Sequence, residues 1–186
     1  KEIADATWRV MATSGLEKAS MRAIAREAGC TTGALVHYFQ NKDELLEFVF
    51  TQASNDVNQQ LETALKEDNI LDAMREISLG VLPLNEEERG RIVAWQGFLR
   101  IAENNEKMAL IVNEIRHAIH KQLTYLVQRG QELGIVRGDF AAEDLAEQFD
   151  ALTEGLSRMA PLEPEHFTAE RLTRLVDMHI EMLKKV

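Results

Sequence analysis

The chain has 186 residues, of which 45% are hydrophobic and 28% are charged, and its net charge at pH 7 is −10. This composition excludes a disordered polar chain. It also excludes a membrane-embedded one, because no apolar run approaches the ~20 residues that a bilayer-spanning helix needs. The single cysteine, Cys30, excludes an internal disulfide, so we expect a reducing, cytoplasmic setting.

Apolar residues recur at helical spacing along the chain and no stretch alternates with a period of two, so the sequence predicts an all-α protein. A first helix is expected from about Glu2 to Ser14. Two short helices follow, at about 21–28 and 32–39; Ser20 and Thr31 are their candidate N-caps, and Gly29 separates them. In the second short helix, Leu35 and Phe39 should face inward, leaving an outer face of Thr32, Gly33, Val36, His37 and Tyr38.

Asn41 and Glu44 have the spacing of a capping box, which predicts the start of a long helix that extends to about Lys66. Further apolar stripes begin at Ile70 and Ile92, and three more helices are expected at about 106–133, 141–159 and 168–185. The acidity is uneven, since residues 1–50 carry a net charge of −1 and the remainder carries −9. We therefore predict two domains, residues 1–48 and residues 49–186.

Two short helices around a glycine-containing turn form the helix-turn-helix pattern, whose second helix enters the major groove of DNA. The acidic total does not oppose this interpretation, because residues 1–50 are nearly neutral and Arg22, Arg26 and Lys42 lie close to the motif. Similar helices also occur in proteins that bind no DNA. The alternative is a helical ligand-binding or scaffolding protein whose head contacts another protein.

Residues 20–46 resemble the DNA-binding segment of the TetR family of bacterial transcriptional repressors. The matching runs are IAREAG at 24–29, T-x-G-x-L at 31–35 and HYFQNKDELL at 37–46. The acidic second part, with PLNEEER at 83–89 and Trp95, also resembles the choline-responsive repressors of betaine synthesis. The resemblance implies a homodimer that binds a palindromic operator in double-stranded DNA and is released by a small-molecule effector.

The resemblance also implies which residues contact DNA: Ser20, Arg22, Thr31, Thr32, Gly33, Ala34, His37, Tyr38 and Lys42. Arginine can bind guanine with two hydrogen bonds, while hydroxyl and ammonium groups suit phosphate. Most family members have tyrosine where this sequence has Val36, and valine cannot donate a hydrogen bond. Either His37 and Tyr38 make the phosphate contact instead, or Val36 contacts the methyl group of a base.

The second domain is expected to hold a ligand between its helices, because the cores of helical bundles house small molecules. A quaternary ammonium ligand beside Trp95 would gain cation–π attraction. The last two helices either close the core internally or pair with a second copy as a four-helix interface. The candidate ligand-binding residues, several of which could equally be ordinary core residues, are Trp95, Phe98, Met108, Ile111, Phe149, Asp150 and Thr153.

No nucleophile–base pair, glycine-rich phosphate loop or acid pair stands out, so we expect neither enzymatic activity nor a cofactor. Glu114 and His117 have the E-x-x-H spacing of di-iron bundles, but such a site needs a second E-x-x-H and two more glutamates on facing helices. The spacing recurs at Glu163 and His166, in a proline-flanked connection that should not be helical. We therefore expect no metal site.

Overall fold

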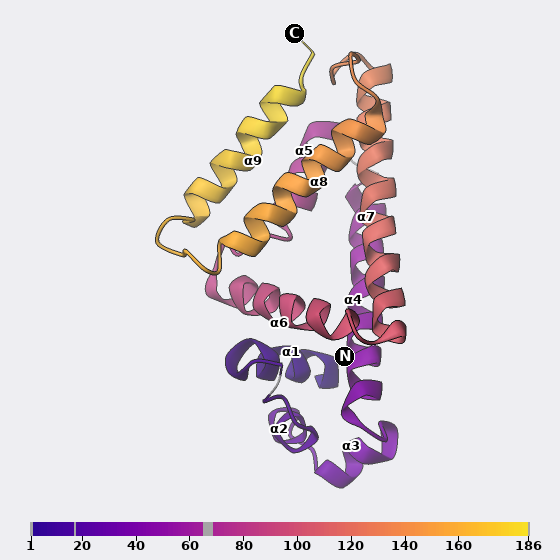
Figure 1. Cartoon of the computed structure of the whole chain (residues 1–186), viewed down its shortest axis with the longest axis vertical. Coiled ribbons are helices and arrows are strands. Elements are labelled where there is room, and N and C mark those ends of the chain that lie inside the picture. The colour runs from indigo at the N-terminus through magenta and orange to yellow at the C-terminus, as the bar shows by residue number, and fades with distance from the viewer. Residues whose placement is uncertain (1, 17, 65–68, 186) are drawn as a thin grey trace. The chain divides into compact units, whose positions relative to one another are not determined.

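The computed structural model describes residues 2–16, 18–64 and 69–185, and the side chains of these residues apart from 56–58 and 60–64. The prediction of an all-α protein is confirmed, and no strand occurs in the described part of the chain. The predicted last residues of the long helix, Leu65 and Lys66, lie outside the described residues. The helices shown in Figure 1 are α1 (Glu2–Ser14), α2 (Met21–Glu27), α3 (Thr32–Tyr38), α4 (Lys42–Ala64), α5 (Ile70–Leu79), α6 (Glu86–Ala102), α7 (Glu106–Glu132), α8 (Ala142–Met159) and α9 (Ala169–Leu183).

The helices form two compact units that do not follow the order of the sequence. Unit 1 comprises Lys1–Asp56 and Glu86–Glu114, and unit 2 comprises Val57–Asn85 and Ile115–Val186. Helix α6 and the first part of α7 thus belong to the same unit as the N-terminal helices. The predicted division into a DNA-binding domain of residues 1–48 and an effector-binding and dimerisation domain of residues 49–186 stays a prediction.

In unit 1, α6 lies along α1, and two glycines of α6 permit the close approach (Figure 1). A Cβ atom added at Gly90 would lie 2.6 Å from the Cβ atom of Ala12, and one at Gly97 would lie 3.3 Å from that of Leu16. The first distance is shorter than real Cβ contacts allow, so any larger residue at position 90 would push the two helices apart.

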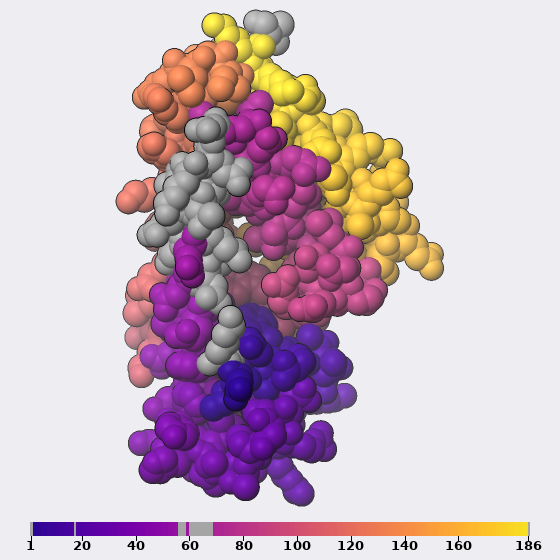
Figure 2. Space-filling model, turned by 180° about the vertical axis from the view of Figure 1, so that it is seen from behind, coloured from indigo at the N-terminus to yellow at the C-terminus, as the bar shows by residue number. Residues whose placement is uncertain are grey.

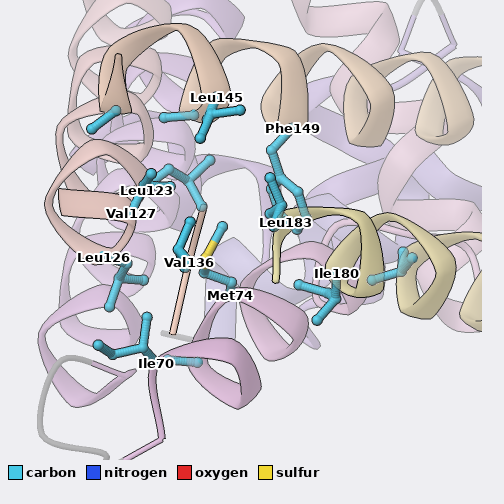
Figure 3. Packing of buried hydrophobic residues seen from close by; sticks show 14 of the residues in the cluster. Ile70, Met74, Leu123, Leu126, Val127, Val136, Leu145, Phe149, Ile180 and Leu183 are labelled. Atoms are coloured by element: carbon cyan, nitrogen blue, oxygen red, sulfur yellow. The ribbon is translucent and has the colours of Figure 1, made fainter. Parts of the chain in front are cut away.

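Unit 2 is built around a buried apolar cluster to which α5, α7, α8 and α9 all contribute (Figure 3). Met74, Leu123, Phe149 and Ile180 each come from a different one of these helices, and burial of such side chains is the main favourable contribution to folding. The yellow surface of α9 borders the magenta surface of α5 (Figure 2). Among the described residues, no helix is long and apolar enough to cross a membrane.

Candidate functional site

The turn between α2 and α3 depends on a left-handed glycine. Gly29 has a φ of +68°, a conformation that L side chains rarely adopt. The N–H of Cys30 donates to the carbonyl of Ala25 at 2.9 Å, and the N–H of Gly29 donates to that of Arg26 at 3.2 Å. This pair of bonds is the Schellman motif, which ends α2 and directs the chain into α3.

Both predicted N-caps are confirmed. The Ser20 hydroxyl accepts a hydrogen bond from the N–H of Ala23 at 3.2 Å, and the Thr31 hydroxyl accepts one from the N–H of Ala34 at 3.1 Å. Accepting these bonds uses the oxygen and leaves each O–H able to donate. Since both residues are exposed, each hydroxyl could donate to an anionic group outside the protein.

Helix α3 presents nearly all of its residues to solvent. Leu35 is 1% exposed and holds the helix to unit 1, as predicted, whereas Phe39 is only half-buried, with its ring 5.2 Å from that of Phe48. Tyr38 is 70% exposed, and the rings of His37 and Tyr38 meet edge to face at 5.4 Å. The other exposed residues of the helix are Thr32, Gly33, Ala34 and Val36.

Helices α2 and α3 border a surface hollow of about 530 Å³, lined by Ser20, Arg22, Ala23, Arg26, Cys30, Thr31 and Thr32. Four of the predicted DNA-binding residues therefore share one concave surface. Arg26 was not in the predicted set, although its spacing of four residues from Arg22 on α2 places both guanidinium groups on one side of that helix. The hollow combines two cationic groups with hydroxyl donors, which is the chemistry that binds phosphate.

Lys42 has a partner that its position in the sequence does not reveal. Its ammonium group donates to the carbonyl of Leu16 at 2.6 Å, which ties the start of α4 to the segment after α1. The predicted Asn41 cap at this helix start is confirmed, because the Asn41 side chain accepts from the N–H of Glu44 at 2.9 Å. The return bond differs from that of a capping box, because the Glu44 carboxylate accepts at 2.7 Å from the N–H of Gln40, one residue before the cap. The charge of Lys42 is thus held at the segment that follows α1.

Four of the predicted ligand-binding residues lie in unit 1: Trp95, Phe98, Met108 and Ile111. Phe98 is fully buried and stacks on Phe50 with ring centroids 3.3 Å apart. The ring of Trp95, which is half-buried, lies 5.7 Å from that of Phe98. Trp8 completes the cluster from α1, with its ring 4.9 Å from that of Phe50. Sequence reasoning missed Phe50 and Trp8, because each belongs to a helix distant from Trp95 along the chain.

The remaining three, Phe149, Asp150 and Thr153, lie on α8 in unit 2, so the structure does not bring the seven into one unit. Phe149 is 1% exposed and belongs to the apolar cluster. The buried Thr153 hydroxyl donates to the carbonyl of Phe149 at 3.0 Å and lies 3.4 Å from the hydroxyl of Ser78. Because its single proton is already donated within the core, this hydroxyl has no proton left to donate to a ligand.

Asp150 is a half-buried carboxyl group in mixed electrostatic surroundings. Burial raises the pKa of Asp150, the guanidinium of Arg116 opposes that change, and the carboxylate of Glu154 adds to it. Arg116 is itself drawn toward Glu154, with Nη1 3.4 Å from Oε2. In the described part of the chain, no group of three or more His, Cys, Asp or Glu residues is placed to hold a metal ion.

His179 of α9 makes unit 2 sensitive to acid. Its ring packs on that of Phe149 at 5.2 Å, its buried Nε2 atom has no hydrogen-bond partner among the described residues, and burial lowers its pKa. A histidine whose pKa is depressed in the folded state destabilises the fold as pH falls below its unfolded pKa of ~6.5, at a slope of at most about 1.4 kcal/mol per pH unit.

We therefore expect the free energy of unfolding to fall as the pH drops below about 7.5, and His179→Gln to flatten that fall. His117→Gln, at an exposed histidine of the same unit, is the comparison variant. Urea unfolding at several pH values measures both slopes. Equal slopes in wild type and His179→Gln would contradict the assignment.

Comparison with known proteins matches the N-terminal and the C-terminal part of the chain to two protein families. The family described as "Bacterial regulatory proteins, tetR family" matches residues 3–49, and the family described as "BetI-type transcriptional repressor, C-terminal" matches residues 71–184. The transcriptional regulator PksA of Bacillus subtilis is 31% identical over 184 residues, covering 98% of this chain and 88% of that protein. The regulator BetI of Vibrio vulnificus is 27% identical over 192 residues, covering 97% and 89%.

Solved structures of transcriptional regulators share the fold of this chain. A transcriptional regulator from a Rhodococcus species has a TM-score of 0.84 at 27% identity, covering 98% of this chain and 94% of that one. A regulator from Saccharomonospora viridis, solved in complex with choline, has a TM-score of 0.90 and covers 100% and 97%; at 18% identity it shows the shared fold alone. The chain belongs to the TetR family of bacterial transcriptional regulators and carries a C-terminal domain of the BetI type.

Proposed function

We propose that this regulator is a ligand-responsive repressor that binds a palindromic operator as a homodimer and is released by a small-molecule effector. The observation that carries the proposal is the hollow between α2 and α3, where Arg22 and Arg26 stand beside the hydroxyl groups of Ser20 and Thr31. Positive charge next to exposed hydroxyl donors favours the sugar–phosphate backbone, and an arginine at such a surface can also bind guanine.

The exposed face of α3 supplies the remaining DNA contacts. A Cβ atom added at Gly33 would meet only Thr31 Oγ1, at 3.9 Å, so nothing inside the protein requires glycine there. Close approach of DNA to Gly33, Thr32 and Ala34 accounts for the small residues on this face. His37 and Tyr38 would contact phosphate and sugar from the far end of α3, and Lys42 would add a positive charge from the start of α4.

The homodimer would form through α8 and α9. Both helices bury one face in unit 2, yet Met178 and Met182 on α9 are 54% and 66% exposed. Met159, the last residue of α8, is 42% exposed, and Leu162 in the turn after it is 70% exposed. Exposed apolar groups of this kind mark interaction surfaces, and a second copy would cover them symmetrically. In a two-fold dimer, the two α3 helices must present themselves about one DNA turn apart, ~34 Å.

An effector acts only if it binds the form that releases DNA better than the form that binds it, typically by ~1–3 kcal/mol. A choline-like cation is the first effector to test, since the Saccharomonospora viridis relative was solved with choline. The half-buried Trp95, with Phe98 and Phe50 beside it, supports this choice because aromatic faces attract quaternary ammonium groups.

The test is selection of bound sequences from random DNA by the full chain, followed by affinity measurements with and without choline. A palindrome should be enriched, and its affinity should fall steeply between about 50 and about 200 mM salt, because phosphate contacts release counterions. A ligand-binding or scaffolding protein whose head contacts another protein would enrich no sequence.

Arg22→Ala should weaken operator binding by ~1–3 kcal/mol, or roughly 5- to 150-fold, because it removes a guanidinium from the hollow. Arg100→Ala is the matched control, since Arg100 is also exposed and also lies in unit 1, on α6. Operator affinity is measured for both variants and for wild type at the same salt concentration. The same loss in both would show that only net charge matters and would remove the hollow from the interface.

A further inference from the structure

Val36 is the branched aliphatic side chain on the exposed face of α3. It is 45% exposed, whereas its neighbour Leu35 is 1% exposed and packs inward. At about 100° per residue, Val36 stands on the same flank of the helix as Thr32, one turn further along. Thr32 lines the hollow between α2 and α3, so Val36 continues the surface on which Arg22 lies.

The fold itself gives no reason for valine at this position. The side chain does not belong to the buried core of unit 1, and valine is a poorer helix former than alanine because its branched Cβ restricts rotation. In a helix of seven residues, an exposed valine therefore costs stability. The exposed part of the side chain is available for a contact outside the protein.

The chemistry of the DNA surface restricts that contact. Valine offers no hydrogen bond, so placing it against a phosphate or a polar base edge would desolvate that group without compensation. Among the groups that the base pairs present in the major groove, the apolar one is the C5-methyl group of thymine. A contact between two apolar groups removes both from water, which is favourable.

We infer that Val36 is a specificity-determining residue that contacts the C5-methyl group of one thymine in each operator half-site. This inference rests on the proposed DNA binding and adds a sequence preference to it. Burying one methyl group is worth a factor of about four in affinity, taken from ~0.8 kcal/mol per buried carbon group. The preference for thymine should therefore be modest at each half-site, and the affinity factors of the two half-sites should multiply.

The experiment removes the methyl group from the DNA and the side chain from the protein. In the selected operator, each thymine is replaced in turn by deoxyuridine, which differs only by lacking the methyl, and affinity is measured for wild type and Val36→Ala. Wild type should lose about four-fold at one position per half-site. Val36→Ala should bind the thymine operator about four-fold more weakly per half-site and show no further loss at that position.

Val93→Ala is the matched control, because Val93 is 42% exposed and lies in unit 1 on α6. It should keep the wild-type response to deoxyuridine. Thermal unfolding of Val36→Ala should show a fold at least as stable as wild type, since alanine is the better helix former.

The outcomes separate the two proposals. If the selection enriches sequences but no deoxyuridine substitution weakens wild type, the Val36 inference is wrong and DNA binding stands. The inference is equally wrong if Val36→Ala keeps the deoxyuridine loss. If no sequence is enriched, the proposed function fails and the Val36 inference fails with it.

Discussion

Phe149→Ala should lower the free energy of unfolding of unit 2 by about 3–5 kcal/mol, the range for removing a buried aromatic side chain. Phe149 is 1% exposed and contacts the shared core of α5, α8 and α9, where its loss would leave a cavity (Figure 3). Urea unfolding followed by circular dichroism measures the change. The result also tests whether Phe149 serves the core or a ligand.

Phe140→Ala is the control for this prediction, because Phe140 lies in the same unit but is 53% exposed. Its loss removes a contact with the Arg137 guanidinium, 4.9 Å from the ring centroid, and should cost below about 1 kcal/mol. The core assignment would be wrong if Phe149→Ala had the same free energy of unfolding as Phe140→Ala. If that variant had also lost effector release, Phe149 would line a ligand site.

Leu35→Ala should destabilise the attachment of α3 by about 2–5 kcal/mol and abolish operator binding. Leu35 is the buried residue of α3, and a helix this short is not stable in water without tertiary contacts. Without the leucine side chain, the exposed face of α3 would lose its fixed orientation. Hydrogen exchange of residues 32–38 and operator affinity are the two measurements.

Leu110→Ala provides the comparison, since Leu110 is 63% exposed on α7 within unit 1. It should leave both exchange and affinity close to wild type, within about 0.5 kcal/mol. Wild-type operator affinity in Leu35→Ala would show that α3 holds its conformation by other contacts and would contradict the role given to Leu35.

The sequence by itself determined the helices and the candidate DNA-binding segment, because the interactions that define them are local. The caps at Ser20 and Thr31 reach three residues along the chain, and the Gly29 turn is closed by bonds within five residues. Residues 20–46 form one continuous segment, so helical periodicity alone separated the inward Leu35 from the outward Val36 and Tyr38.

Only the tertiary structure decided which apolar faces meet. Periodicity shows that a helix has an apolar side but not which partner covers it, since that depends on shape at contacts between residues far apart in sequence. The close approach of Gly90 to Ala12 placed α6 with the N-terminal helices, and the bond from Lys42 to Leu16 joined two segments that no local pattern connects. For the same reason, the candidate effector residues, chosen along one predicted domain, are divided between the two units.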